Sequence, residues 1–596
     1  MSYGLRGKHR APRIPRRQRP PAAYPQVDLA IVCESTYPYL TGGLSAVVHQ
    51  ICEANPNRRI GIIHIAWDRS TPMEPLYDVP PQVKWVMPLY QSMSEHRSTF
   101  LSLQPRHDRL GRRARARVVE RLFEALEAHV RGDDRHLWAL YDEGINPRTR
   151  VYRLWPVISS PMFMIRAREY FAASGLSFTS LFWELREFFS LAFAVVDVNF
   201  PKAAVYHAHT TGAAGLLAAA AARQNDTTFL LTEHNLYARD TINHLLERSM
   251  DTVVTQGEWR TLTEYDTSAF VPERVQVTPR QRAWMAWWIH TGLVAYRAAS
   301  LITYLYPDAI EEARGLGGAS HKSVVVANGV QPSMFDEARA EFDARQARER
   351  SDEARIWRLA YAARVVPIKG LLDLLEALAL LVRRGVSDWE LDVMGPDGEM
   401  PDYAAACRMR TTELGLDGHV KFLGSVNLRQ RMGLYDALIL PSHNEGQPIV
   451  VLEAMTVGLP TIGTYVGGMK QLVEDPIPVQ SADGADVIGA CGALVRSHDV
   501  IGMAGAIERL MTDPEAFRSY SANAKDRVDR YFHLDTAMAN YRALYRRFGS
   551  VPEDELLEEW PIMPRRSVPV TESVDVERVE VDVESERSEH AARRAA

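Results

Sequence analysis

The chain has 596 residues, of which 46% are hydrophobic and 24% are charged. This composition is typical of a soluble globular protein and excludes a fibrous or largely disordered chain, and the length leaves room for about two to four domains. The four cysteines include no C-x-x-C pair, which excludes a disulfide framework and a zinc ribbon. We therefore expect a reducing, cytoplasmic compartment.

The net charge of −6 conceals two ends of opposite charge. Residues 1–25 contain seven Lys or Arg and no acidic residue, whereas residues 551–596 contain thirteen Asp or Glu and six Arg. We predict that both are disordered tails. The remaining 56 basic and 62 acidic residues are balanced, which argues against a nucleic-acid-binding core.

The basic tail lacks the apolar region of a secretory signal. Two interpretations of it are open: contact with anionic lipid or nucleic acid, which would place the protein at the cytoplasmic face of the membrane, and a solvated extension without a partner. We favour the solvated extension, because blocks of like charge are often only that.

Nearly continuous apolar runs predict buried parallel strands, and helical stretches between them predict crossover connections. The apolar stretch at residues 283–296 is shorter than the ~20 residues of a membrane span and predicts a buried or interfacial helix. The runs lie at residues 27–35, 59–67, 202–209, 228–235 and 301–306, and then at 356–366, 389–396, 419–426, 436–442, 459–466 and 492–497.

This rhythm predicts a doubly wound α/β fold in which two Rossmann-like domains face each other. The charged helical pattern at residues 95–150 predicts an exposed helix pair inserted into the first domain, and a polar stretch between the two series predicts a linker. The predicted segments are a tail (1–25), the N-terminal domain (26–330), a linker (331–355), the C-terminal domain (356–515), terminal helices (516–550) and a second tail (551–596).

The segment LPSHNEGQPIVVLEAM carries the strongest functional signal. A strand that ends near Leu440 is followed by a helix that we expect to start near Pro448, with Gly458 as its C-cap. Free N–H groups at that helix start would bind the phosphates of a nucleotide. Glu445 before the helix and Glu453 inside it could accept hydrogen bonds from sugar hydroxyls, or simply be a capping acid and a solvated helical residue.

Two further strand-to-helix loops point to an anion site. Arg364 and Lys369 in ARVVPIKG could flank a diphosphate, one as a fork and one as a point charge. Gly42 and Gly43 would let the backbone approach a ligand, although the dinucleotide fingerprint is absent. The sequence also contains neither a Walker A motif nor H-E-x-x-H.

Two neighbouring strand ends in the first half carry polar side chains: His207 and His209 in YHAHTTG, and Glu233 and His234 in TEHNLYARD. Ligands of open α/β sheets bind beyond the carboxyl ends of the strands. We therefore expect one functional histidine here, without a choice between the candidates from the residues alone.

Taken together, these motifs resemble glycosyltransferase family 4, whose fold is GT-B. The family pattern E-G-x-P-x-x-x-x-E-A-M-x-x-G-x-P corresponds to residues 445–460, and its R-x-x-x-x-K-G loop to residues 364–370. VVVANGV, which contains Asn328, resembles the segment at the family's interdomain hinge. Ala363 departs from the glycine of many members. Within the family, ESTYPYLTGGLSAVVHQ and YHAHTTGAAGLLAA resemble the PelF-like enzymes of exopolysaccharide synthesis, although His209 is unusual there.

The resemblance implies a retaining transferase that uses no metal and no cofactor other than its nucleotide-sugar donor, which we expect to be UDP-linked. The implied diphosphate contacts are Arg364, Lys369 and Gly43. The implied sugar and ribose contacts are Glu445 and Glu453. The full set of expected donor-site residues is Gly42, Gly43, Arg364, Lys369, Glu445, Gly446, Gln447, Pro448 and Glu453.

On the other side of the site, the resemblance implies that His209, or alternatively His207, contacts the transferred sugar. Glu233 and His234 would then lie on the acceptor side. The expected catalytic group comprises His209, Glu445, Arg364 and Lys369. We expect a glycan acceptor, inner-membrane polysaccharide-synthesis proteins as candidate partners and no nucleic acid. Two other functions stay open: a catalytically idle binding or assembly protein, and a nucleotide-sugar epimerase.

Overall fold

A seven-stranded parallel sheet forms the centre of the first domain in the computed structural model, which describes residues 24–102, 105–246, 277–349, 355–479 and 486–549. The strands lie in the order β3-β2-β1-β4-β5-β6-β7. All neighbouring pairs are parallel. The strands are β1 (Val27–Glu34), β2 (Ile60–Ala66), β3 (Val83–Tyr90), β4 (Ala203–Ala208), β5 (Thr228–Glu233), β6 (Leu301–Tyr304) and β7 (Ser323–Val325).

Both faces of this sheet are covered, which explains the continuous apolar runs of its strands. Alternate residues of β1 join different cores: Ala30 and Val32 pack with α8 and α11, whereas Leu29 and Ile31 pack with α1 and α21. The covering helices are α1 (Gly43–Glu53), α8 (Gly212–Asn225), α9 (Tyr237–Leu245), α11 (Pro279–Ala298), α12 (Pro307–Gly315) and α21 (Leu534–Phe548).

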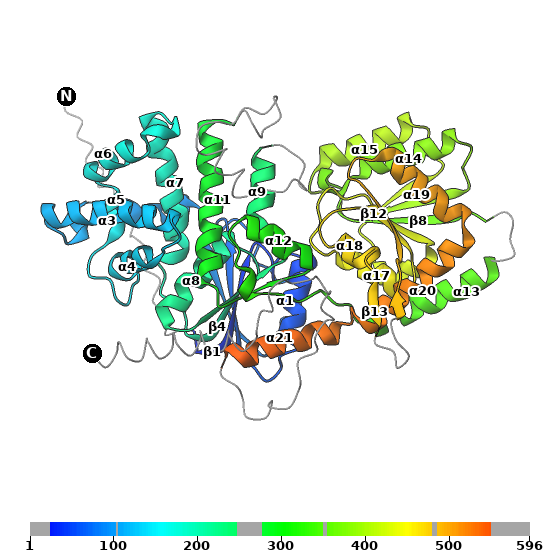
Figure 1. The fold of residues 1–596 in the computed structure, drawn as a ribbon, viewed down its shortest axis with the longest axis horizontal. Helices are drawn as coiled ribbons and strands as arrows, with labels where there is room; N and C mark the ends of the chain where they lie inside the picture. Colours follow the sequence, from blue (N-terminus) through cyan, green and yellow to red (C-terminus); the bar gives the residue numbers. More distant parts are fainter. Residues whose placement is uncertain (1–23, 103–104, 247–276, 350–354, 480–485, 550–596) are drawn as a thin grey trace, which may run out of the picture.

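A block of helices extends the first domain away from the second (Figure 1). The exposed helix pair predicted at residues 95–150 is only part of it, because three more α-helices follow before β4. The block also has its own aromatic core, in which the rings of Phe123 and Phe163 stack at 5.6 Å. Its helices are α2 (Met93–Ser102), α3 (Arg112–Val130), α4 (Arg135–Gly144), α5 (Leu154–Ile158), α6 (Pro161–Tyr170) and α7 (Phe178–Val196).

The apolar stretch at residues 283–296 lies within α11, as predicted for a buried helix. A capping box between Thr278 and Gln281 fixes the start of α11. α11 packs tightly on α8, because a Cβ on Gly215 would lie 2.9 Å from Cβ of Ala295. Among the described residues, no helix combines the length and apolar content that crossing a bilayer requires.

The second domain contains a six-stranded parallel sheet in the order β10-β9-β8-β11-β12-β15, with a separate antiparallel pair. The strands are β8 (Trp357–Ala362), β9 (Trp389–Met394), β10 (Val420–Gly424), β11 (Ala437–Leu440), β12 (Thr461–Thr464), β13 (Ile477–Val479), β14 (Asp486–Ile488) and β15 (Gly492–Val495). The helices are α14 (Leu371–Arg383), α15 (Pro401–Glu413), α16 (Leu428–Arg431), α17 (Ile449–Val457), α18 (Met469–Val473), α19 (Val500–Thr512) and α20 (Pro514–Arg530).

The predicted linker at residues 331–355 contains a packed helix, α13 (Asp336–Glu349). Ala338 and Phe342 are spaced for one helical face and are buried in the core of the second domain. On the same side Arg345 forms a buried ion pair with Asp436 at 2.7 Å. The linker prediction missed this helix because the segment is polar overall and only a narrow stripe on one face of the helix is apolar.

The chain crosses between the domains twice, at adjacent points. The backbone N–H of Val330 donates to the carbonyl of Phe532, and the N–H of Leu534 donates to the carbonyl of Val330, each at 2.9 Å. After this second crossing, α21 runs along the first domain (Figure 1). The predicted tails lie outside the described residues, except for Tyr24 and Pro25.

Candidate functional site

The carboxyl ends of the two sheets meet at the loops that the sequence singled out. A Cβ on Gly446, in the loop after β11, would lie 2.0 Å from the carbonyl oxygen of His234, in the loop after β5. Only a glycine permits this approach of the two domains. The structure therefore brings together the histidine-bearing loops of the first domain and the acidic loop of the second.

Two helix starts face this junction without side-chain caps. α1 begins after Gly42 and α17 begins after Pro448, and neither of these N-cap residues has a side chain that caps its helix. The two starts are neighbours, because a Cβ on Gly43 would lie 3.7 Å from Cδ1 of Ile449. α17 ends at Gly458 in the left-handed conformation, as predicted. Uncapped N–H groups and helix dipoles make this junction suitable for an anion.

Lys369 and Glu445 form an ion pair in front of α17. Nζ of Lys369 lies 2.5 Å from Oε1 of Glu445, and the two side chains are 17% and 10% exposed. Arg364 is further out and about half exposed, and its Nη1 lies 2.7 Å from both carboxylate oxygens of Glu399. Of these two cations, Lys369 is largely buried and Arg364 is accessible, and each is held by a carboxylate.

Glu453 projects from the middle of α17 into a partly buried environment. Burial raises the pKa of its carboxyl to about 7, against a smaller opposing effect from Arg429. Near neutral pH a substantial fraction of Glu453 is therefore protonated and can both donate and accept a hydrogen bond.

Three histidines form a row at the ends of β4 and β5. Nδ1 of His209 lies 2.9 Å from Nε2 of His234, and the rings of His207 and His209 are 4.3 Å apart. Burial is the main reason that the pKa of His234 falls to about 4 and that the pKa of His209 falls well below its ordinary value. The row is therefore neutral at physiological pH, and neutral imidazoles can exchange hydrogen bonds with hydroxyl groups.

His207 differs from the prediction. Both of its ring nitrogens are occupied inside the protein, Nδ1 by the hydroxyl of Tyr545 and Nε2 by Oγ1 of Thr232, each at 2.8 Å. His207 therefore holds α21 against the sheet and has no nitrogen to offer a sugar. Nε2 of His209, in contrast, is buried without a hydrogen-bond partner among the described residues.

Glu233 is buried beside this row. Its Oε1 accepts hydrogen bonds from the hydroxyls of Tyr296 at 2.7 Å and Thr211 at 3.0 Å, whereas Oε2 has no partner within the described part of the chain. Burial raises the pKa of Glu233 to about 7, although these hydrogen bonds oppose the rise. A carboxyl with this pKa can exchange a proton near neutral pH.

Gln447, which was predicted to bind the donor, lies at a contact between the two domains. Its Oε1 accepts from the backbone N–H of Asn328 at 2.6 Å, its carbonyl accepts from Nδ2 of Asn328 at 3.0 Å, and its Nε2 donates to Gln471. Gln447 therefore ties the second domain to the hinge segment that contains Asn328. Its side chain is engaged between the domains in this structure, and its contact with a donor stays a prediction.

Two important groups escaped the sequence analysis. Glu34, at the end of β1, is partly buried and accepts from the backbone N–H groups of Ala213 and Ala214, and burial raises the pKa of its carboxyl to about 7. Arg239 crosses to the second domain, where its Nη2 donates to Oδ1 of Asn444 at 3.1 Å. Both lie in segments already noted, but neither residue belongs to a motif that distinguishes it from the other polar side chains of these segments.

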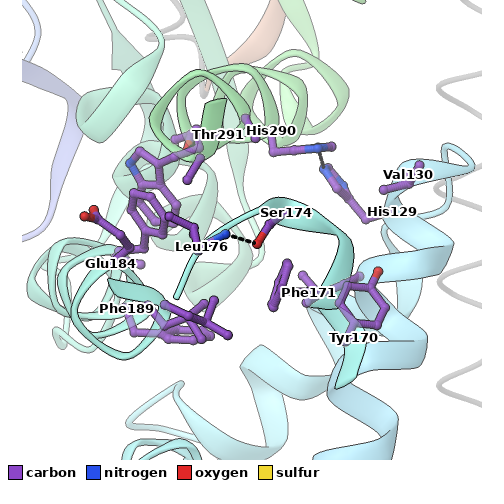
Figure 2. A pocket seen from close by; sticks show the side chains of 18 of the residues that line it. His129, Val130, Tyr170, Phe171, Ser174, Leu176, Glu184, Phe189, His290 and Thr291 are labelled. Carbon is purple, nitrogen blue, oxygen red and sulfur yellow. Dashed lines mark hydrogen bonds between the residues drawn. The ribbon is translucent and has the colours of Figure 1, made fainter. Parts of the chain in front are cut away.

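A cavity of about 500 Å³ lies elsewhere, between the helical block and α11. Figure 2 shows part of its mainly apolar lining, including Phe171 and Phe189, with His129 and His290 in contact at one edge. It shares none of the residues of the junction described above. Its apolar lining does not suit the phosphates of a nucleotide, so we place the candidate site at the junction.

Two family models match the chain. Residues 27–321 match a domain of unknown function, DUF3492, and residues 357–513 match a model described as glycosyl transferases group 1. The second match contains Lys369, Glu445 and Glu453, and the first contains His209 and Glu233.

Curated relatives align with part of the chain. A D-inositol 3-phosphate glycosyltransferase of Saccharomonospora viridis is 31% identical over 180 residues, which cover 29% of this chain and 39% of the relative. An alpha-D-kanosaminyltransferase of Streptomyces kanamyceticus is 30% identical over 194 residues, which cover 32% of this chain and 45% of the relative. The chain thus spans less than half the length of these two relatives.

A solved structure extends the likeness to most of the chain. HepE (Alr3699) of Anabaena, crystallised in complex with UDP, has a TM-score of 0.50 at 15% identity, and the match covers 87% of this chain and 100% of HepE. At this identity the likeness concerns the fold. It confirms the predicted α/β architecture of two facing Rossmann-like domains, the GT-B arrangement.

Proposed function

We propose that this chain is a glycosyltransferase that moves a sugar from a UDP-linked donor to a glycan or exopolysaccharide acceptor. The observation that carries the proposal is the Lys369–Glu445 pair beside the uncapped start of α17. One cation, free N–H groups and one carboxylate at a single junction provide partners for both a diphosphate and a sugar.

Transfer requires stabilisation of the negative charge that develops on the leaving diphosphate. Lys369 would bind phosphate oxygens from a largely buried position, and Arg364 would do so from the accessible rim after leaving Glu399. The N–H groups at the starts of α17 and α1, the latter at Gly43, would add fixed dipoles. In this mechanism UDP is the leaving group, and the protein neutralises the charge of its diphosphate.

The remaining second-domain contacts orient the donor. Glu445 would accept from hydroxyls of the transferred sugar, and Glu453 would bind the ribose hydroxyls, to which its protonated form can also donate. UDP as the nucleotide agrees with the ligand of HepE, whose fold this chain shares. Retention of anomeric configuration and independence from metal are part of the proposal, by resemblance to family 4.

The first domain would supply the residues that contact the transferred sugar and the acceptor. His209 would contact the transferred sugar through Nε2, and Glu233 and His234 would bind the acceptor, Glu233 through Oε2. His234 contacts both His209 and Gly446. We therefore infer that the two domains separate at the His234–Gly446 contact to admit substrates. The PelF-like segments of this domain favour an exopolysaccharide acceptor.

Calorimetric titration with UDP, GDP, ADP and their sugar conjugates tests the proposal. We expect selective binding of UDP compounds, weakened at least about tenfold by Arg364→Ala, since a charge-assisted hydrogen bond contributes about 1.5 to 3 kcal/mol. Arg384→Ala is a matched control, because Arg384 forms a comparable surface pair with Glu508 in the same domain.

The outcomes separate the alternatives. UDP release that depends on an added glycan supports transfer. Conversion of the donor sugar without an acceptor would identify an epimerase instead. A folded protein that binds no nucleotide would overturn the proposal in favour of an idle assembly protein.

A further inference from the structure

Three side chains from three separate segments of the second domain converge on its surface. Asp373 lies in the first turn of α14, His443 follows β11, and His498 lies between β15 and α19. Nδ1 of His498 lies 2.9 Å from Oδ2 of Asp373, and Nε2 of His443 lies 3.8 Å from the same oxygen. One ligand atom from each residue lies within 4.8 Å of the other two.

These spacings suit a single metal ion. Ligand atoms about 2.1 Å from a zinc-sized ion are roughly 3 to 3.5 Å apart, so small movements of the side chains would place all three around one centre. The rings of His443 and His498 stack at 4.0 Å with an interplanar angle of 26°, which sets their edges side by side. The cluster is partly exposed, and water could complete the coordination.

The surroundings of the histidines favour coordination. Nδ1 of His443 lies 2.9 Å from Oγ of Ser497, which leaves Nε2 to face the carboxylate when Nδ1 carries the proton. Metal-binding histidines are usually oriented by such a bond on their other nitrogen. His498 has a φ of +62°, a left-handed conformation uncommon for a residue other than glycine, and this conformation presents its ring to Asp373.

We propose that Asp373, His443 and His498 bind a divalent transition-metal ion of the zinc class. Two imidazole nitrogens and one carboxylate oxygen suit Zn²⁺, Co²⁺ or Ni²⁺ better than Mg²⁺ or Ca²⁺, which prefer all-oxygen sites. Three protein ligands leave a further position for water.

The ion would act on the conformation of the loops and not as a catalyst. Asp373 lies four residues after Lys369, and His443 lies two residues before Glu445. These two loops already touch, because the N–H of His443 donates to the carbonyl of Ile368 at 2.8 Å. An ion would add a cross-link between them and the loop that contains His498.

The proposed site does not depend on the transferase assignment, and its test does not use activity. Metal-free full-length protein would be titrated with Co²⁺, followed by visible absorption, and Zn²⁺ competition would then be measured by calorimetry. The variants are His498→Asn, which tolerates the left-handed backbone, and Asp373→Asn. His533→Asn is the control, because His533 lies 3.5 Å from Asp535 and belongs to no three-ligand cluster among the described residues.

We expect wild type and His533→Asn to bind one ion with the same affinity, and both site variants to bind it at least about tenfold more weakly. Zn²⁺ should raise the melting temperature of wild type more than that of His498→Asn at the same Zn²⁺ concentration. If wild type binds no ion, or if His498→Asn binds as wild type does, the cluster is only a surface ion pair and the proposal is wrong.

Discussion

Nζ of Lys369 lies 2.5 Å from Oε1 of Glu445, so the principal cation of the candidate site is paired with its principal acceptor. Both side chains are largely buried, which strengthens their attraction relative to that of a surface pair. A diphosphate that binds Lys369 would compete with Glu445 for the ammonium group. The carboxylate would then be available to the sugar, so the pair couples recognition of the two halves of a nucleotide-sugar.

This coupling predicts that substitutions of Lys369 and Glu445 reduce ligand affinity in different ways. Lys369→Ala should weaken binding of both UDP and a UDP-sugar at least about tenfold, because a charge-assisted contact to phosphate is lost. Glu445→Ala should weaken binding of the UDP-sugar but not of UDP, because Lys369 loses a competing partner. Calorimetry with both ligands checks this pattern.

The exposed pair Lys421 and Glu390, 2.7 Å apart in the same domain, provides matched controls. Lys421→Ala and Glu390→Ala should leave both affinities unchanged. Equal losses of UDP and UDP-sugar affinity in Glu445→Ala would contradict the assignment of Glu445 to the sugar.

Substitutions of the two neighbouring histidines should have different effects: one should lower stability and the other should lower turnover. His207→Ala removes two buried hydrogen bonds and leaves Tyr545 and Thr232 without that partner, so it should lower the free energy of unfolding by about 2 to 4 kcal/mol. His209→Ala loses one such bond and should cost about 1 kcal/mol, but should lower kcat at least about tenfold. Urea denaturation and donor turnover of both variants, with nucleotide affinity as the common control, distinguish these roles. If His207→Ala lowered kcat and His209→Ala lowered stability instead, both assigned roles would be wrong.

The raised pKa of Glu233 predicts a pH-dependent stability. Between about pH 4.5 and 7 the unfolded state loses this proton while the folded state keeps it, so stability falls as pH rises through this range and then levels off. Glu233→Gln removes the effect. Relative to wild type, the variant should gain about 3 kcal/mol in unfolding free energy from pH 4.5 to pH 8. Denaturation at both pH values tests this, and Glu390→Gln, at an exposed site, should show no such gain.

The contact between Gly446 and His234 predicts that a single methyl group can keep the domains apart. In Gly446→Ala the new Cβ would meet the carbonyl of His234 at 2.0 Å, so the two loops could not close. Turnover should fall at least about tenfold because the reacting groups are displaced, with little change in melting temperature. Gly418→Ala is the control, because a Cβ there has nothing within 4 Å. Wild-type turnover in Gly446→Ala would show that this contact is not part of the working state.

The strands were predictable where burial on both faces produced a continuous apolar run, as in β1. β3 was missed because it is the edge strand of its sheet: its residues alternate between buried and more exposed positions, and it contains Pro88. α13 was missed because only a narrow stripe of its surface, including Phe342, is apolar.

The site was predictable to the extent that loops after parallel strands meet at one edge. The sequence predicted the strand that contains His207, but it could not show that α21, whose Tyr545 lies 338 positions later, covers this face of the sheet. Nor could it reveal the cluster of Asp373, His443 and His498, whose members are far apart in the chain and share no motif. Such relationships depend on tertiary packing and have no local pattern.

The position of α21 has a consequence for how the protein is made. Tyr541, Leu544 and Tyr545 belong to the core on one face of the first sheet, although they lie near the end of the chain. During synthesis, the strands of the second domain leave the ribosome before these residues do. The second domain can therefore complete its sheet while the first still has an uncovered apolar face, which is open to aggregation or chaperone binding. The domain that is synthesised first is finished last.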